Sequence, residues 1–388
     1  MNFSFLTPLS EEVLTHIQLL PPLSIGEKVS CHTLEDGIPD LEGVQLAILG
    51  VLENRKSESD NYNPLHFEDV RKAFYGLFPG SWSVSIADLG DIAPGETVED
   101  TYFALKETLT ILLENKIIPV ILGGSQDLTY VNYRAYDDLI PMVNLVNVDH
   151  NFDLGDAAKP ITNKSFVAKI IMEEPYNLFN YATIGYQTYF NSQEEIDLMK
   201  KLYFEAYRLG EVSNDITITE PVLRDANIVS VDLGAVKSSE LSDLQQVSPN
   251  GIDGKEICAI SRYAGISNKV SSFGIYNYQA GSKYKLTETL IAQILWYFVE
   301  GFDGRVSDDV LSNGTDFQKY ITLVQDYELI FYKSLRTGRW WIDIPFLSSV
   351  NNKLKKHTLL PCDKKDYDLA CNNIVPDRWF KAHQKNNL

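Results

Sequence analysis

Short, almost continuous apolar runs recur along the first 300 residues, and each run ends at polar or glycine residues. The first run covers residues 44–52 (VQLAILGVL), and similar runs follow at 117–124, 142–149, 181–186 and 227–234. Runs of this length and continuity are typical of strands that are buried on both faces of a parallel sheet. The pattern therefore predicts a mainly parallel sheet at the centre of the fold.

Helical patterns separate these runs. Residues 67–78 and 287–302 space their apolar positions for a helix that packs on one face, and Thr97 with Asp100 forms a capping-box pattern before residues 101–116. Strands that alternate with helices predict an α/β fold in which helices cover both faces of the sheet.

The last 80 or so residues have a different pattern. YELIFYKS (327–334) and RWWIDIP (339–345) flank a turn near Thr337 and Gly338, which predicts a β-hairpin. Asp363 is expected to cap a short helix, and Pro376 is expected to end regular structure. The predicted organisation is an N-terminal segment (1–43), an α/β domain (44–304) and a C-terminal extension (305–388).

The charge and the cysteines exclude several classes of protein. The net charge of −19 opposes binding to nucleic acid or to an anionic membrane surface, because phosphates would be repelled. No apolar run is long enough to span a membrane, and the N-terminus does not resemble a signal peptide. The four cysteines are scattered, so no disulfide framework is expected. These features predict a cytoplasmic protein without membrane insertion.

Three of the predicted strands end in residues that can carry chemistry. They end in GGSQD (123–127), DHNFD (149–153) and SVDLG (230–234). In open α/β sheets the ligand site lies beyond the carboxyl ends of the strands, so these three segments are expected to meet there.

In this order the three motifs resemble those of the ureohydrolase family, which contains arginase, agmatinase and formiminoglutamase. The family pattern reads GGDHS, then DAHxD, then SxDxDxxDP. AILGV (47–51) is similar to the first family strand, IADLGDI (86–92) to the family's DLGD turn, and GIDGKE (251–256) to its GGLTYRE motif. The resemblance covers residues 44–302 and is greatest to the formiminoglutamase branch. It implies a three-layer α/β/α sandwich, with a mainly parallel sheet of about eight strands and two manganese ions at the strand ends.

The family's metal ligands are only partly kept. The resemblance places Asp149, Asp153 and Asp232 at ligand positions, and it places Gln126 where the family has a histidine. These four residues would hold the first metal. At the second metal, Asn151 replaces a histidine and Gly234 replaces an aspartate, and the two ligands that remain, Asp149 and Asp232, are shared with the first. The pocket is therefore degenerate, and we expect either no cofactor or one weakly bound divalent cation (Mg, Ca or Mn).

Glu256 and His150 allow two interpretations each. Glu256 matches the family position that holds the substrate, and it could equally cap a surface helix. His150 directly follows Asp149, so strand alternation favours a place in the core or behind the ligands, although a register shift could bring it to the metal side. Three converging carboxylates repel each other, and a metal, a shared proton, Lys164 or Lys237 could neutralise them.

Two functions follow from the degenerate pocket. The favoured one is a pseudoenzyme that has lost binuclear manganese hydrolysis and acts in binding or assembly. The alternative is an active hydrolase, with one metal or a rearranged site, that cleaves a formimino, guanidino or amide C–N bond. A homo-oligomer is possible, and so is a protein partner that binds the C-terminal extension through Trp340 or Trp341.

Overall fold

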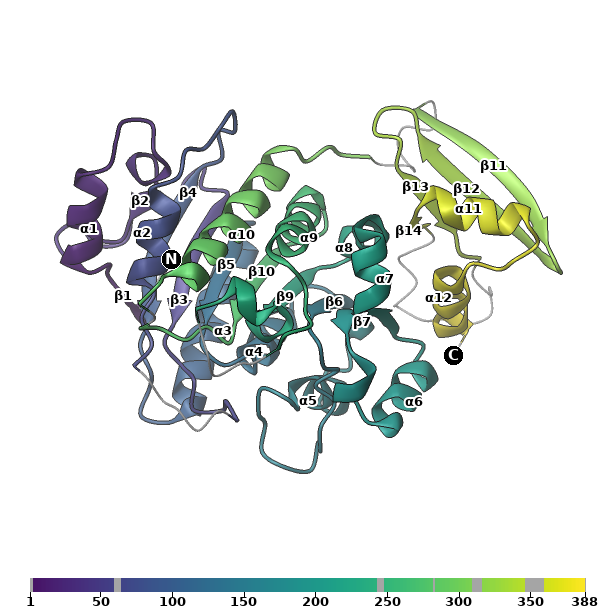
Figure 1. Ribbon diagram of the computed structural model, residues 1–388, viewed down its shortest axis with the longest axis horizontal. Helices are drawn as coiled ribbons and strands as arrows, with labels where there is room; N and C mark the ends of the chain where they lie inside the picture. The colour runs from purple at the N-terminus through teal and green to yellow at the C-terminus, as the bar shows by residue number, and fades with distance from the viewer. Residues whose placement is uncertain are drawn as a thin grey trace.

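A ten-stranded sheet forms the centre of the computed structural model (Figure 1). The structure describes residues 3–58, 64–242, 248–281, 283–308, 316–345 and 359–387. The strands of the sheet are β1 (Leu6–Thr7), β2 (Ser30–Cys31), β3 (Leu46–Val51), β4 (Ile86–Ile92), β5 (Ile118–Gly123), β6 (Val143–Val148), β7 (Leu178–Tyr186), β8 (Glu205–Arg208), β9 (Ile228–Asp232) and β10 (Ser272–Tyr276). Their order is β1-β4-β3-β5-β10-β9-β6-β7-β8, with β2 also paired to β4.

Every pairing in this sheet is parallel except that of β1 with β4. The strands β3 to β10 form the parallel body, and β1 and β2 add only two residues each. This arrangement confirms the predicted mainly parallel sheet of about eight strands. The segment IADLGDI forms the buried strand β4, where the resemblance suggested a turn.

Helices cover both faces of the sheet, which makes the predicted three-layer sandwich. One layer contains α1 (Glu11–Gln18), α2 (Glu68–Tyr75), α7 (Leu209–Asn214), α8 (Thr219–Arg224), α9 (Gly254–Ile266) and α10 (Leu286–Asp303). The other contains α3 (Val98–Glu114), α4 (Leu128–Arg134), α5 (Phe166–Met172) and α6 (Gln193–Lys201). Short 3-10 turns are η1 (Ile25–Glu27), η2 (Thr188–Phe190), η3 (Ile216–Ile218), η4 (Leu233–Ala235) and η5 (Ser238–Glu240). In the parts of the chain that the structure describes, no helix has the length and apolar character to cross a membrane.

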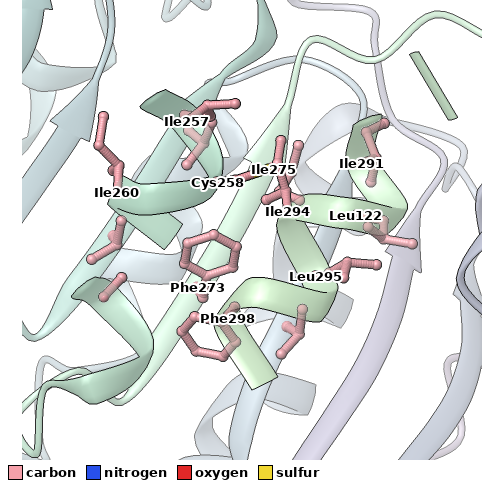
Figure 2. Packing of buried hydrophobic residues seen from close by; sticks show 14 of the residues in the cluster. Leu122, Ile257, Cys258, Ile260, Phe273, Ile275, Ile291, Ile294, Leu295 and Phe298 are labelled. Carbon is pink, nitrogen blue, oxygen red and sulfur yellow. The ribbon is translucent and has the colours of Figure 1, made fainter. Parts of the chain in front are cut away.

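Alternating residues of each central strand pack into different layers. In β3, Leu46 and Ile48 join the core beneath α2 and α10, and Leu49 joins the core beneath α3. Figure 2 shows the first of these cores, where side chains of α9 and α10 lie over those of β5 and β10. Phe273 of β10 stacks on Phe298 of α10, with 4.3 Å between the ring centroids. Burial of both faces explains why the strands read as continuous apolar runs.

The C-terminal extension forms a second, antiparallel sheet with its own core. Its elements are β11 (Phe317–Val324), β12 (Tyr327–Ser334), β13 (Trp340–Asp343), β14 (Leu359–Cys362), α11 (Lys364–Cys371) and α12 (Asp377–Asn387). β12 and β13 form the predicted hairpin, and Asp363 caps α11. The expectation for Pro376 was wrong, because α12 begins at the next residue. Proline fits the start of a helix, where the first backbone N–H groups have no partner within the helix.

The extension packs against the main sandwich through charged and aromatic contacts. The Arg224 guanidinium of α8 donates to the carbonyl of Cys362 at 2.9 Å and lies 4.6 Å from the centre of the Trp341 ring. Trp340 stacks on Tyr367 of α11. Trp340 and Trp341 are only 7% and 8% exposed, so both rings make their contacts within the chain.

Candidate functional site

Three carboxylates lie together at the carboxyl ends of two neighbouring strands. Asp232 is the last residue of β9, and Asp149 directly follows β6, which pairs with β9. Asp153 reaches the same place by a turn, because the chain bends at 149–151 and Asp153 itself adopts a left-handed backbone with φ 53°. The carboxylates converge through this turn, because β6 ends at Val148, before Asp149. Aspartate accepts this conformation more readily than most residues do.

Amide groups hold the carboxylates in position. The Asn147 side chain in β6 donates to Asp149 at 3.2 Å and to Asp153 at 3.0 Å. The Asn277 side chain donates to Asp232 at 2.8 Å, and the backbone N–H of Gly234 donates to the same oxygen at 2.7 Å. Each acid therefore has a neutral donor and no ion-pair partner among the described lysines and arginines.

The environment disfavours full ionisation of the cluster. Burial raises the pKa of Asp153 well above the usual carboxyl range, and the charges of Asp149 and Asp232 raise it further. Burial, and then the charge of Asp149, raise the pKa of Asp232 to about 8, although the donors Gly234 and Asn277 act in the opposite direction. A bound cation or a retained proton would relieve this repulsion.

A cavity of about 330 Å³ opens onto the cluster. Its deep wall contains Asp153 and Asp232, whereas Asp149 lies behind them and is fully buried. The remaining wall is mostly polar and neutral, with Lys164 and Glu58 as its other charged residues. It consists of Ser57, Glu58, His150, Asn151, Asn163, Lys164, Phe190, Gly234, Ser248, Asn277 and Gln279.

The positions of Gln126, Asn151 and Gly234 differ in their access to this cavity. Gln126 is buried behind the acids and donates to Asn147 at 2.8 Å, so it supports the amide that holds them. Asn151 lines the cavity, but its amide faces the His150 ring at 3.2 Å. Gly234 lines the cavity without a side chain.

These residues fit one cation better than the manganese pair of the family. Asp149, Asp153 and Asp232 form an oxygen-rich cluster, and the raised pKa values of Asp153 and Asp232 indicate that a cation would be stabilised there. At the place of the family's second metal ion, Gly234 has no side chain to act as a ligand, and Asn151 has an amide in place of an imidazole. The donor set therefore does not match a second ion.

The His150 ring lies at the cavity, contrary to the placement that strand alternation favoured. β6 ends at Val148, so the turn that follows directs the ring toward the acids. One ligand atom from each of Asp149, His150 and Asp232 fits within a 4.8 Å cluster. Of the two lysines considered, Lys164 lines the cavity and lowers the pKa of Asp232, whereas Lys237 lies 4.0 Å from Asp253.

Glu256 belongs to the start of helix α9 in this structure. Its carboxylate accepts from the backbone N–H of Asp253 at 3.0 Å, and its own N–H donates to the Asp253 carboxylate at 2.8 Å. This reciprocal pair is a capping box, and Glu256 is not among the residues that line the cavity.

Three residues of the site were not predicted from the sequence: Asn147, Asn277 and Phe190. Asn147 carried a usable signal, because it is a polar residue inside an apolar strand and lies two positions before Asp149, on the same face. Asn277 directly follows β10, and Phe190 ends the short turn η2 between β7 and α6, so neither had a pattern that marked it.

Comparisons with known proteins agree with this fold. The model of the arginase family matches residues 68–299. A formimidoylglutamase of Streptococcus gordonii is 22% identical over 261 residues, which cover 62% of this chain and 79% of that protein. The fold is similar to formimidoylglutamase of Bacillus subtilis (TM-score 0.62, 19% identity, 69% of this chain and 90% of that one). It is also similar to a formiminoglutamase of Trypanosoma cruzi with Mn²⁺ (TM-score 0.60, 16% identity, 69% and 96%). The family model matches more than half of the chain, and the chain therefore belongs to the arginase family.

Proposed function

We propose that this chain binds one divalent cation at Asp149, Asp153 and Asp232, and that it holds a small polar ligand in the adjoining cavity without binuclear hydrolysis. The observation that carries this proposal is the convergence of three buried carboxylates, next to Gly234, which offers no further acid. In a two-metal site the paired cations generate a nucleophile from bound water. With Gly234 and Asn151 at the second position, this chain has lost side chains that would support such a pair.

The residues of the chain have clear parts in the proposed binding site. The three acids supply negative charge, and Asn147 and Asn277 orient the acids through the hydrogen bonds described above. Asn151, Asn163 and Gln279 line the cavity with groups that both donate and accept hydrogen bonds. Such a wall is suited to a polar ligand that contacts the cation at its inner end.

Metal content tests this proposal. Protein dialysed against manganese and then against metal-free buffer is expected to hold at most one ion per chain by elemental analysis. Asp232→Asn should abolish binding, and Glu107→Gln, on the exposed side of α3, should leave it unchanged. Two manganese ions per chain would contradict the proposal.

The alternative function is a hydrolase that acts with one metal or a rearranged site on a formimino, guanidino or amide bond. The observation that favours it is the His150 imidazole in the cavity wall, because a histidine can move a proton at neutral pH. Sensitive assays for released urea, formamide and ammonia separate the two functions. Turnover that Asp232→Ala abolishes would establish the hydrolase.

We also propose that the C-terminal extension provides the contact of a homo-oligomer, and that the protein is cytoplasmic. The support for assembly is that Ile321 and Leu323 on the terminal strand β11 are 56% and 75% exposed. An edge strand with exposed apolar side chains is suited to pairing with a second copy. Light scattering after chromatography should show a smaller particle for the double change Ile321→Lys and Leu323→Lys, and an unchanged mass would contradict this role.

A further inference from the structure

We infer that His150 supplies a nitrogen ligand to the cation, in place of the histidine that the family has at the position of Asn151. This inference rests on the proposed function, because it assigns a ligand to the single cation proposed above. His150 lies one residue before the position of the family's histidine, and the turn after β6 brings its imidazole to the acid cluster.

The His150 ring presents a free nitrogen to the acid cluster. Its Nδ1 atom is buried and forms no hydrogen bond, although it lies 3.3 Å from a carboxylate oxygen of Asp149. Asp149, His150 and Asp232 each contribute one ligand atom to a group that spans no more than 4.8 Å. A buried imidazole nitrogen without a partner, facing two carboxylates, has the composition of a mixed nitrogen and oxygen metal site.

Neighbouring residues fix the backbone and the ring of His150. Its carbonyl accepts from the backbone N–H of Gln187 at 3.0 Å and from the Asn191 side chain at 3.0 Å. The Phe190 ring packs edge-on against the imidazole, with 4.9 Å between the centroids. Metal ligands that are held in this way lose little conformational freedom when the ion binds.

Asn151 has a new role in this arrangement. Its amide nitrogen lies 3.2 Å from Nε2 of His150. As placed, this amide nitrogen donates to Nε2; when Nδ1 binds the cation, the ring proton lies on Nε2, and a 180° turn of the amide presents its oxygen to Nε2–H. Asn151 is therefore a positioning residue for the imidazole and no longer a ligand.

The nitrogen ligand changes which cations the site prefers. Three carboxylates alone suit Mg²⁺ or Ca²⁺, whereas an added imidazole favours Mn²⁺, Co²⁺ or Zn²⁺. We therefore expect the chain to bind Mn²⁺ more tightly than Mg²⁺, and we expect His150→Gln to remove most of that preference.

Pulsed electron paramagnetic resonance of bound Mn²⁺ tests the assignment directly. The spectrum should show coupling to ¹⁴N in the unchanged protein and in His16→Gln, a control on the distant helix α1. In His150→Gln the coupling should disappear, and Mn²⁺ affinity should fall by about 10- to 100-fold in calorimetry, the usual effect of losing a metal-site residue. Asn151→Ala should keep the coupling and weaken binding by a smaller factor.

The outcomes separate this inference from the proposed function. If Mn²⁺ binds the unchanged protein without ¹⁴N coupling, or if His150→Gln keeps both the coupling and the affinity, His150 is not a ligand and the one-cation proposal survives. If Mn²⁺ binds no variant and not the unchanged protein, both fail. Thermal melting of each variant without metal confirms folding, and Phe190→Ala, which leaves every ligand atom in place, provides a second way to disturb the ring.

Discussion

At the scale of single residues, the acid cluster depends on one neutral side chain. The Asn147 amide is fully buried and donates to Asp149 and Asp153, and its own oxygen accepts from Gln126. It therefore links the carboxylates to the end of β5 and keeps them close in spite of their repulsion. A buried polar group with this many partners has a large effect when it is removed.

Asn147→Ala is expected to lower the free energy of unfolding by about 1–3 kcal/mol, because the buried partners lose their donor. Urea denaturation measures the change. The matched control is Asn115→Ala at the exposed end of α3, which should have a much smaller effect. Equal effects at the two positions would show that the Asn147 network is not important for stability.

The raised pKa of Asp232 predicts how the stability of metal-free protein depends on pH. The unfolded chain ionises this carboxyl near pH 4, whereas the folded chain keeps the proton until about pH 8. Folding therefore takes up a proton between these values, and stability should fall as pH rises from 4 to 8. Melting temperatures measured in a chelator should show this fall, and Asp232→Asn should reduce it. A curve that rises equally in both proteins would contradict the raised pKa.

The triple change Gln126→His, Asn151→His and Gly234→Asp restores the family's ligand types at the strand ends. We expect manganese content to rise from at most one ion per chain toward two, because the second position regains an imidazole and a carboxylate. Elemental analysis and calorimetry measure the stoichiometry. A folded triple variant that still binds a single ion would show that the turn after β6 no longer has the family's geometry.

At the scale of secondary-structure elements, helix α12 covers the end of the main sheet through a buried ion pair. Arg378 of α12 contacts Glu205 of β8 at 2.7 Å, and Asn180 of β7 donates to the same carboxylate at 2.8 Å. Burial would raise the pKa of Glu205, but the charges of Arg378 and Lys385 outweigh burial and lower the pKa to about 2. The extension is thus held to the sheet by a buried ion pair, and removal of either partner would leave the other charge buried without compensation.

Arg378→Ala should release α12 from the sheet, because it leaves the Glu205 carboxylate buried without its cation, a loss of about 3–5 kcal/mol. Limited proteolysis should cut the extension sooner, and Lys381→Ala on the same helix serves as the control. Acid should act similarly in the unchanged protein. The contribution of Glu205 is complete above about pH 4.3 and is lost as pH falls toward 2. Unchanged cleavage in Arg378→Ala would show that α12 is held by other contacts.

At the scale of the whole molecule, two sheets with separate cores are joined by several contacts, and one of these is centred on Trp341. Trp341 of β13 lies between Arg224 of α8 and Phe317 of β11 at this contact. The side chain connects the extension to the sandwich and is unavailable to a partner in this conformation.

Trp341→Ala is expected to destabilise the protein by about 3–5 kcal/mol, the usual range for loss of a buried tryptophan. Its mass in solution should stay the same, because the ring makes contacts within the chain. Thermal melting and light scattering measure the two effects. If the variant keeps its stability but changes its oligomeric state, Trp341 is an interface residue after all.

The sequence by itself determined the fold class and the family. Buried parallel strands must be apolar on both faces, so each central strand was visible as a continuous run, and the polar residues that follow β6 and β9 marked the site. Capping boxes at Thr97 and Asp363 were also visible, because they depend on residues three positions apart. The expectation that Asn151 and Gly234 stand at ligand positions of the family also came from the sequence alone.

Only the tertiary structure decided how the site is arranged. The turn at 149–151 brings His150 to the acids, and the left-handed backbone of Asp153 sets its carboxylate beside Asp149. Neither follows from strand periodicity, because the period of two ends where the strand ends. The support from Asn277 and the docking of α12 through Arg378 join segments that are far apart in the chain. Such contacts depend on packing between distant elements, and local patterns of residues do not record them.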